Sequence, residues 1–483
     1  MYSKGLLGYL PANILQGIIG FATLMVFTRI LTPQQYGDYA LTFGLSSLAQ
    51  TLFFTWIEAS MARFYPSESR QDIEAPKLYG TLYRSFILVF IGFGLLCTLG
   101  LWLWPGTGPL KLAIGLGLGS VVFRSLAKLV QEQRKSEGRV GAASLIDMMQ
   151  TAGGFVIGVG CAWAGLGGGS PVLGAGLIAA LCLPFFVRED WTRAARGVFD
   201  RNHAKIYAQY GFPVSASLIL TLALYTVDRF LIAHYLSEAQ AGAYHAGFSL
   251  ASRILDVLFV WFGAAGGPAM VHALENGGEG ALRDQARQQI RTMAFVLFPA
   301  VGGLIMVSPA LGQLLIGEAL RDQATAVAPL ISLGALFSGL NTYYFLQAFT
   351  LAKRTKLLVV AMAIPAVSNI VLNLALIPVM GLEGAALASC LSFALGLAGS
   401  WLLGLNTLPL PIAWFDLAKT AACVAIMMAA VALVPAWGGI VELVAKGVTG
   451  VAVYAALALA LDLNNIRALA SRITSRLRPK AAT

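Results

Sequence analysis

Long apolar runs constrain the fold of this chain more than any other feature. Stretches of about twenty residues with few charges recur along the whole 483-residue sequence, and a helix of that length crosses the hydrocarbon core of a bilayer. Of the residues, 58% are hydrophobic and 12% charged, whereas soluble chains are about one quarter charged. We count about fourteen runs, near residues 10–31, 37–59, 81–103, 110–131, 141–163, 171–188, 207–232, 241–266, 292–316, 325–351, 357–379, 382–405, 415–434 and 440–462.

These runs are expected to be helices, because lipid offers the backbone no hydrogen-bond partner. Strands of a membrane barrel alternate polar and apolar residues, and these runs do not. The first run is too long for the hydrophobic region of a signal peptide and is interpreted as the first span. The expected fold class is therefore an all-α integral membrane protein with about fourteen transmembrane helices.

The basic residues are distributed by side of the membrane. With the N-terminus inside, the outer connections TPQQ, AGLGGGS, LSEAQ and PAWGG contain no Lys or Arg, and most of the 33 basic residues fall on the inner side. This asymmetry follows the positive-inside rule and predicts that both termini are cytoplasmic. Topology thus explains the net charge of +10, and nucleic acid is not an expected partner.

An internal repeat links the two halves of the chain. The stretch LTPQQYGDYALTFGL at 31–45 returns as LSEAQAGAYHAGFSL at 236–250, with six identities in fifteen positions. The first copy joins spans one and two, and the second joins spans seven and eight. Because six spans lie between them, the halves enter the membrane in the same direction, which predicts two lobes related by a pseudo-two-fold axis along the membrane normal.

The repeat predicts four segments. Residues 1–188 form an N-lobe of six helices, and residues 189–206 form a polar cytoplasmic linker. Residues 207–406 form a C-lobe of six helices, and residues 407–483 form two further helices with a basic cytoplasmic tail.

The repeat and its surroundings resemble a known family. The stretches RILTPQQYGDYALTFGL, DRFLIAHYLSEAQAGAYHAGFSL and NIVLNLALIPVMGLEGAALASCLSF look like Wzx-type polysaccharide-repeat flippases of the multidrug/oligosaccharidyl-lipid/polysaccharide exporter (MOP) superfamily. The resemblance implies a bilobal fold and alternating access. It also implies a polyprenyl-diphosphate-linked oligosaccharide as cargo, for export as exopolysaccharide, capsule or O-antigen. A polymerase and a chain-length regulator are the partners that it implies, besides membrane lipid.

Ionisable side chains inside spans are the candidate cargo-binding residues, because each is costly in hydrocarbon. In span four, Ser120, Arg124, Lys128 and Gln131 share one helix face. Arg suits bidentate contact with a diphosphate, which makes Arg124 the leading candidate. For Lys128, and also for Arg124, the alternative is that the side chain extends to the cytoplasmic interface.

Span eight carries a second polar stripe, with His245, Ser249, Ser252 and Asp256 on one face and Arg253 at its edge. Arg253 and Asp256 form either a structural salt bridge or a site where substrate phosphate, a proton or a cation binds. His245 titrates near neutral pH in the ordinary case, but its place near the outer interface favours a structural role.

Two further carboxylates complete the candidate set. Asp147 lies about 10 Å into span five and is a candidate partner of Arg124. Glu58 lies near the inner end of span two, where it binds cargo, caps the helix or pairs with Arg63. Asp228 and Arg229 precede the repeated turn, a position that favours a structural role at lobe closure.

The sequence contains none of the common enzyme motifs. There is no Walker loop, no metal-ligand cluster and no nucleophile elbow, so we expect neither an enzyme nor a bound cofactor. The five cysteines lie in apolar runs without metal-like spacing. An H⁺ or Na⁺ gradient, the membrane potential or the cargo gradient is left to supply energy.

Several alternatives stay open at this point. A drug/cation antiporter on the same scaffold would favour a carboxylate-lined cavity, and the two arginines Arg124 and Arg253 count against it. A lipid II flippase has closely related cargo. A membrane-embedded glycan polymerase or ligase would need a large outer loop, and every outer loop here is short.

Overall fold

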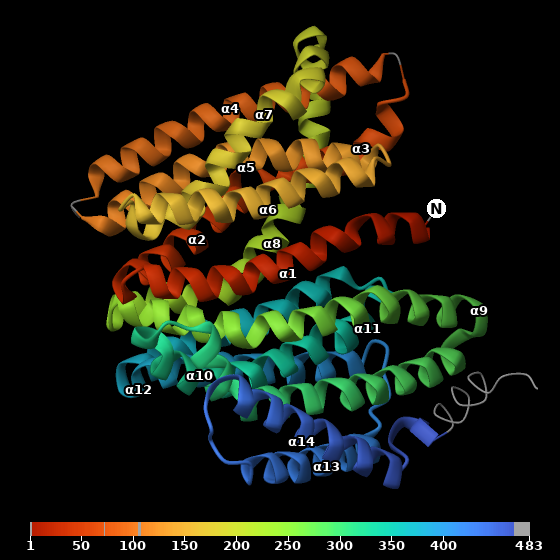
Figure 1. The fold of residues 1–483 in the computed structure, drawn as a ribbon. Helices are drawn as coiled ribbons and strands as arrows, with labels where there is room; N and C mark the ends of the chain where they lie inside the picture. Colours follow the sequence, from red (N-terminus) through yellow and green to blue (C-terminus); the bar gives the residue numbers. More distant parts are fainter. Residues whose placement is uncertain (1, 72, 105–107, 468–483) are drawn as a thin grey trace, which may run out of the picture. The chain divides into compact units, whose positions relative to one another are not determined.

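The computed structural model describes residues 2–71, 73–104 and 108–467, so the predicted basic tail beyond residue 467 lies outside the described residues. Within these ranges the chain is helical and contains no strand (Figure 1). The longer helices are α1 (Tyr2–Ile30), α2 (Pro33–Phe53), α3 (Thr55–Glu68), α4 (Glu74–Leu103), α5 (Pro109–Ser136), α6 (Val140–Trp163), α7 (Ser170–Arg196), α8 (Arg201–Tyr235), α9 (Glu238–Leu315), α10 (Glu318–Leu340), α12 (Thr355–Leu405), α13 (Trp414–Ala432) and α14 (Gly439–Ala460). Short turns of helix are η1 (Gly167–Gly169), η2 (Asn341–Phe345), α11 (Gln347–Leu351) and η3 (Leu463–Asn465).

Among the described residues, eleven helices are long and apolar enough to cross a membrane, or up to twelve when the bent pair α2 and α3 is one span. Two of them, α9 with 78 residues and α12 with 51, are broken at Gly278 and Gly381, where φ is positive. Each is long enough for two crossings of about twenty residues. The all-α membrane fold is confirmed, and the count of fourteen spans stays a prediction.

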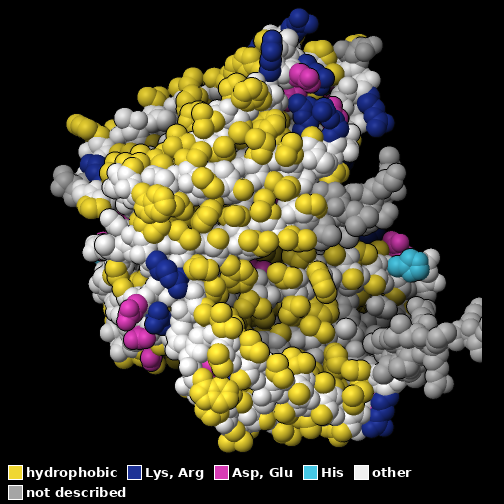
Figure 2. All heavy atoms as spheres, in the orientation of Figure 1, with side chains coloured by type: hydrophobic (Ala, Val, Ile, Leu, Met, Phe, Trp, Pro, Cys, Tyr) yellow, Lys and Arg dark blue, Asp and Glu magenta, His cyan; other side chains and the backbone are white. Residues whose placement is uncertain are grey.

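Hydrophobic side chains cover most of the face shown in Figure 2, with charged side chains toward its margins. Exposed hydrophobic side chains of the described residues include Trp102, Phe185 and Val379, at 77%, 84% and 81%. Such contiguous apolar surface is unusual for a soluble protein and is what contact with lipid requires.

By its contacts the chain divides into two compact units, residues 1–246 and 247–483. The predicted linker 189–206 lies inside unit 1, where the N–H of Val198 donates to the carbonyl of Pro76 at 3.1 Å. A Cβ at Gly80 would lie 2.5 Å from the Val198 nitrogen, so only glycine admits this approach. A division by contacts does not test a division by repeat, and the four predicted segments stay a prediction.

The two copies of the repeat contact each other within unit 1. A Cβ at Gly37 would collide with the carbonyl of Glu238, and a Cβ at Gly242 would lie 3.1 Å from the carbonyl of Pro33. Gly37 aligns with Gly242, and Pro33 aligns with Glu238, so the two contacts are reciprocal. Reciprocal contacts of this kind are the signature of a two-fold relation.

Both copies also begin their helices in the same way. Thr32 caps α2 by accepting from the N–H of Gln35, whose side chain accepts in return from the N–H of Thr32. Ser237 accepts from the N–H of Gln240 at 3.2 Å at the start of α9. An N-terminal hydroxyl that satisfies an unpaired helix N–H stabilises a helix start by about 1 kcal/mol. The repeated letters therefore encode the same turn twice.

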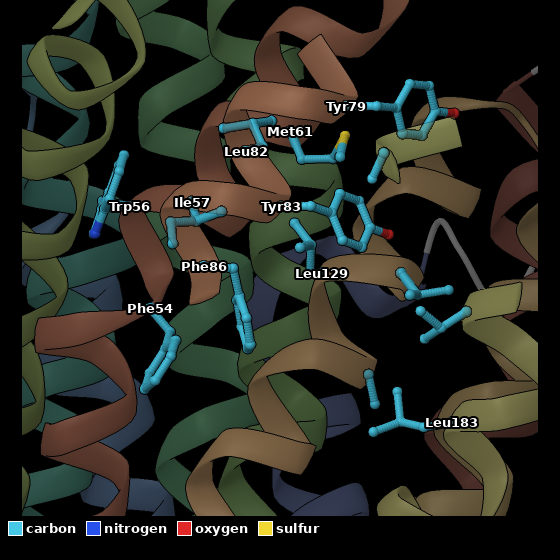
Figure 3. Packing of buried hydrophobic residues seen from close by; sticks show 14 of the residues in the cluster. Phe54, Trp56, Ile57, Met61, Tyr79, Leu82, Tyr83, Phe86, Leu129 and Leu183 are labelled. Carbon is cyan, nitrogen blue, oxygen red and sulfur yellow. The ribbon is translucent and has the colours of Figure 1, made fainter. Parts of the chain in front are cut away.

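The expected single span at 37–59 is bent by 49° where α2 meets α3, at Phe54. The Phe54 side chain is fully buried, with ring centroids 5.1 Å from Phe86 and 5.6 Å from Phe93. It belongs to the cluster in Figure 3, which also contains Ile57 and Met61 of α3. The bend has no proline or glycine at its centre, so we attribute it to this aromatic packing.

A buried charged network joins three helices of unit 1. Arg134 of α5 contacts Asp190 of α7 at 3.1 Å, and Gln133 donates to the same carboxylate at 2.8 Å. Gln133 also donates to the Tyr79 hydroxyl of α4 at 2.9 Å. Since Asp190 is fully buried and has these partners, the network fixes α4, α5 and α7 against one another.

Candidate functional site

The polar stripe predicted on span four is carried by α5, and its members have different surroundings. Ser120 and Gln131 are buried and donate to the carbonyls of Gly117 and Ala143. Arg124 is half-buried and Lys128 exposed. Neither cation has a hydrogen bond or an ion pair within 4.0 Å in the described part of the chain. Two of the four polar groups are thus used in packing, and the two cations remain available.

Glu58 faces the same two cations. It lies in the first turn of α3, is 5% exposed, and interacts electrostatically with both Lys128 and Arg124. The Thr55 hydroxyl donates to one of its carboxylate oxygens at 3.5 Å. The first turn of a helix favours a negative charge, because its N–H groups point toward it.

The expected alternative partner of Glu58 has another contact. The guanidinium of Arg63 lies over the ring of Phe64, 6.0 Å from its centroid, and forms no ion pair with Glu58 within 4.0 Å. The structure therefore groups Glu58 with Arg124 and Lys128. We call these three residues the α3–α5 charge cluster.

Asp147 has a partner other than the one considered from the sequence. The Gln16 amide of α1 donates to its carboxylate at 2.6 Å, and no ion pair joins Asp147 to Arg124 among the described residues. The expectation of an Arg124 pair is therefore wrong. Because α6 packs on α1, the carboxylate reaches a neutral amide there.

His245 lies among aromatic rings of α2. Its ring centroid is 5.9 Å from that of Tyr36, 5.7 Å from Tyr39 and 6.4 Å from Phe43, and its side chain is 6% exposed. It belongs to the second copy of the repeat, and the three aromatic residues to the first. This packing supports the structural interpretation of His245 over a binding role.

Asp228 is also enclosed by this region. The Tyr244 hydroxyl donates to its carboxylate at 2.9 Å, and both residues are buried. Arg229 interacts electrostatically with Asp228 and Tyr244. These contacts support the predicted structural role of Asp228 and Arg229 next to the repeated turn.

Arg253 and Asp256 lie on α9 in unit 2. They interact electrostatically but form no ion pair within 4.0 Å, and Asp256 is exposed. The Nε of Arg253 is buried without a hydrogen-bond partner among the described residues. The simple salt bridge considered from the sequence is therefore absent here, and the second alternative, a binding role, stays a prediction.

Sequence reasoning missed a turn of π-helix in unit 2. The segment NTYYF at 341–345 forms η2, in which Leu346 N–H donates to the Asn341 carbonyl at 2.9 Å. π-Helical turns inside α-helices are rare and recur at functional sites. Its side chain Tyr343 interacts electrostatically with Asp256. The letters NTYYF carry no signal for this geometry, because they suit an ordinary helix.

Among the described residues, no three His, Cys, Asp or Glu side chains are grouped so that they could hold a metal ion. The five cysteines are free thiols. Two groups of candidate residues from the sequence analysis keep charges without an ion pair among the described residues: the α3–α5 charge cluster in unit 1 and the surroundings of Asp256 in unit 2.

Comparisons with known proteins give a family match over part of the chain and a fold. A family model described as "Polysaccharide biosynthesis protein" matches residues 110–325. The lipid II flippase MurJ, in an inward closed conformation, is similar with a TM-score of 0.77 and 15% identity, over 95% of this chain and 99% of that one. The chain shares the fold of that flippase. This result and the family match confirm the resemblance to Wzx-type flippases.

Two transporters of the MOP superfamily have a similar fold. An inward-facing multidrug resistance MATE transporter has a TM-score of 0.63 and 14% identity, over 86% of this chain and 99% of that one. A MOP transporter from Pyrococcus furiosus has a TM-score of 0.51 and 14% identity, over 83% and 92%. A search of curated proteins gives no match. At these identities the MOP likeness defines the fold and leaves the choice of cargo to the site residues.

Proposed function

We propose that this protein flips polyprenyl-diphosphate-linked oligosaccharide units across the bacterial inner membrane by alternating access, for polysaccharide export. Both termini are then cytoplasmic, and the protein acts as a transporter and not as an enzyme. The observation that carries the proposal is the α3–α5 charge cluster, in which two cations of a spanning helix have no ion pair within 4.0 Å among the described residues.

The cost of these cations is the physical argument. A charged side chain within a membrane is unfavourable unless it faces water or is paired, by about 2.5–3.5 kcal/mol on insertion scales. Arg124 and Lys128 are one helical turn apart on α5, a rise of about 6 Å. A diphosphate carries charge over a similar length, and a guanidinium binds phosphate oxygens in a bidentate manner.

Glu58 gives the cluster a second state. Its carboxylate interacts with both cations when cargo is absent and competes with a bound diphosphate for them. Cargo can shift the conformational equilibrium only by the difference between its affinities for the two states. A state in which Glu58 holds the two cations less tightly binds the diphosphate more tightly, and this makes the difference larger. Glu58 therefore acts as a counter-ion that cargo displaces.

The energy source follows from what the sequence lacks. Without a nucleotide-binding motif, transport draws on an H⁺ or Na⁺ gradient, the membrane potential or the cargo gradient. Membrane lipid and the lipid-linked oligosaccharide are the partners that this mechanism requires. A polymerase and a chain-length regulator are partners that the family resemblance suggests.

A lipid II flippase is the second candidate, favoured by the structural likeness to MurJ. Its cargo is chemically close, and the same two cations would bind it. A drug/cation antiporter is disfavoured, since an organic cation would be repelled by Arg124 and Lys128. The family match to polysaccharide biosynthesis proteins supports the oligosaccharide as cargo.

The test is translocation of a labelled short-chain polyprenyl-diphosphate oligosaccharide in proteoliposomes. We expect wild type to expose the glycan on the opposite leaflet and Arg124→Ala to do so at least ten-fold more slowly, because a charge-assisted hydrogen bond contributes about 1.5–3 kcal/mol. Arg63→Ala is the matched control, since it removes an exposed arginine of unit 1 outside the cluster.

Two results would overturn this assignment in different ways. Equal rates for wild type and a well-folded Arg124→Ala would remove the α3–α5 charge cluster from the mechanism and leave the function standing. A wild-type protein that moves no such lipid but exchanges organic cations for protons would replace the function with the antiporter.

A further inference from the structure

One face of α9 in unit 2 carries three glycines, one carboxylate and one aromatic ring. Asp256, Phe259, Gly263, Gly266 and Gly267 recur at spacings that place them along one side of the helix. The missing side chains of the three glycines leave room for groups from other elements. Other groups can therefore pack closely against this face of the helix.

Tyr343 of the π-helix η2 occupies the first of these spaces. Its ring stacks on Phe259, with centroids 5.7 Å apart and planes 17° apart. A Cβ at Gly263 would lie 2.6 Å from this ring, so glycine is required there. Tyr343 is half-buried, so part of its side chain is accessible.

Gln289, from the second part of α9, occupies the next space. The amide nitrogen of Gln289 donates to the Tyr343 carbonyl at 2.9 Å. The same nitrogen lies 2.3 Å from a Cβ built at Gly266. Its carbonyl oxygen, Oε1, is buried and has no hydrogen-bond partner among the described residues. Gln289 is 6% exposed, and a buried acceptor without a partner costs about 1–3 kcal/mol.

Gln347 and Asp256 extend the same face. The carbonyl oxygen of Gln347 lies 3.7 Å from a Cβ built at Gly267. Asp256 interacts electrostatically with Tyr343 and is exposed, although it lies within an apolar helix. An exposed carboxylate in a spanning helix is expected to face water or a polar ligand and not lipid.

The geometry points to a glycan subsite in unit 2, formed by Tyr343, Gln289, Gln347 and Asp256. Sugar hydroxyls both donate and accept, and this set offers a hydroxyl, two amides and a carboxylate beside an aromatic ring. The flat apolar face of a pyranose ring packs against aromatic surface as other apolar groups do. The inference deepens the proposed function and rests on it: these residues of unit 2 would bind the sugar of the cargo.

Purely structural packing explains less of what is seen. Packing accounts for the Phe259–Tyr343 stack, but it leaves the Gln289 acceptor unsatisfied and the Asp256 carboxylate exposed. A polar ligand satisfies both. The π-helical turn matters because it aims Tyr343 and the Tyr343 carbonyl at α9 within one short segment.

The test compares binding of two kinds of probe to the full chain in lipid nanodiscs. One probe is farnesyl diphosphate, and the others are farnesyl diphosphates that carry glucose, galactose, mannose or N-acetylglucosamine. The measured quantity is the ratio of Kd for the bare probe to Kd for each glycosylated probe. We expect wild type to bind at least one glycosylated probe more tightly than the bare one.

Tyr343→Phe and Gln289→Leu are the test variants, because each keeps the size of the side chain and the first keeps the ring stack. Each is expected to reduce the ratio roughly 3- to 10-fold, the effect of losing one hydrogen bond. Tyr454→Phe is the matched control, since its hydroxyl donates to the Phe295 carbonyl in the same unit but outside the subsite. Arg124→Ala is expected to weaken all probes and to leave the ratio unchanged.

The possible failures are distinguishable. If wild type binds no probe, the proposed function fails and the subsite with it. If wild type binds farnesyl diphosphate and no sugar improves the affinity, the subsite is wrong and the diphosphate site stands. If both variants fold and keep the wild-type ratio, the sugar is read elsewhere and this assignment is overturned.

Discussion

Asp190 illustrates how one residue can hold a membrane unit together. Its carboxylate is fully buried, and its two oxygens contact Arg134 at 3.1 Å and Gln133 at 2.8 Å. Arg134 is itself 7% exposed. A buried ion pair adds little net stability when it forms, but removal of one partner leaves the other charge buried and unpaired.

We therefore expect Asp190→Asn to lower the free energy of unfolding by about 3 kcal/mol. Thermal unfolding of purified protein in detergent measures this. Glu189→Gln, next to it and exposed, should change stability by less than about 0.5 kcal/mol. Equal stability of the two variants would show that the network does not hold α5 to α7.

At the scale of elements, the chain depends on close helix contacts that only glycine permits. The reciprocal contact of the repeat is the clearest case, because each glycine meets backbone and not a flexible side chain. Backbone cannot rotate away, so an added methyl group forces the two elements apart.

Gly37→Ala is expected to destabilise unit 1 by about 1–3 kcal/mol, the range for overpacking. Gly92→Ala is the control: a Cβ there meets nothing within 4 Å, and alanine favours a helix by up to about 1 kcal/mol. Unfolding midpoints of the two variants should therefore move in opposite directions. A stable Gly37→Ala would contradict the contact.

The start of α8 gives a pH dependence. Asp200 accepts from the backbone N–H of His203 and of Asn202, and these bonds hold the pKa of its carboxyl below the ordinary value of about 3.9. A carboxyl with a lowered folded pKa stabilises the fold above its unfolded pKa, and the effect is lost as pH falls through the folded pKa.

We expect Asp200→Asn to unfold at a lower temperature than wild type at pH 7, since asparagine caps the helix without the charge. The gap should close as pH falls from about 5 to below about 3, where Asp200 of the wild type becomes protonated. Unfolding midpoints across this range measure it. A gap that widens toward acid would contradict the assignment.

At the scale of the whole molecule, the distribution of charge predicts topology. The connections that lack Lys and Arg should face outward, and the basic ones inward. Ala436 lies in an outer connection and Arg139 in an inner one, and both are exposed in the structure.

In a cysteine-free background, Ala436→Cys should react with a membrane-impermeant maleimide in intact spheroplasts. Arg139→Cys should react only after the membrane is permeabilised. The opposite pattern would invert the proposed orientation and with it the direction of flipping.

The sequence was sufficient for features that depend on composition and local pattern. Apolar run length predicts spanning helices, and the repeat predicts that the turns at Thr32 and Ser237 match. Features set by tertiary packing were not accessible. The bend at Phe54 arises from Phe86 and Phe93, which lie more than thirty residues away. A bend without proline or glycine leaves no local trace.

The candidate site divides in the same way. Arg124, Lys128 and Glu58 could be chosen because charges in apolar runs are rare, and the structure groups them. The partner of Asp147 could not be predicted from the sequence, because the choice between Gln16 and Arg124 depends on how the helices are placed. Tyr343 and Gln289 carry no charge and resemble ordinary interior residues, so only the contacts with α9 identify them.

The reciprocal contact between the copies of the repeat has a consequence for the history of the chain. A single half-length ancestor, associating with a second copy of itself, would have made both contacts with one glycine and one backbone carbonyl. After the two copies were fused, the two glycines became separate positions that mutate independently. The fused gene can therefore let its halves diverge everywhere except at this shared joint, where a change in either copy must be accommodated by the other.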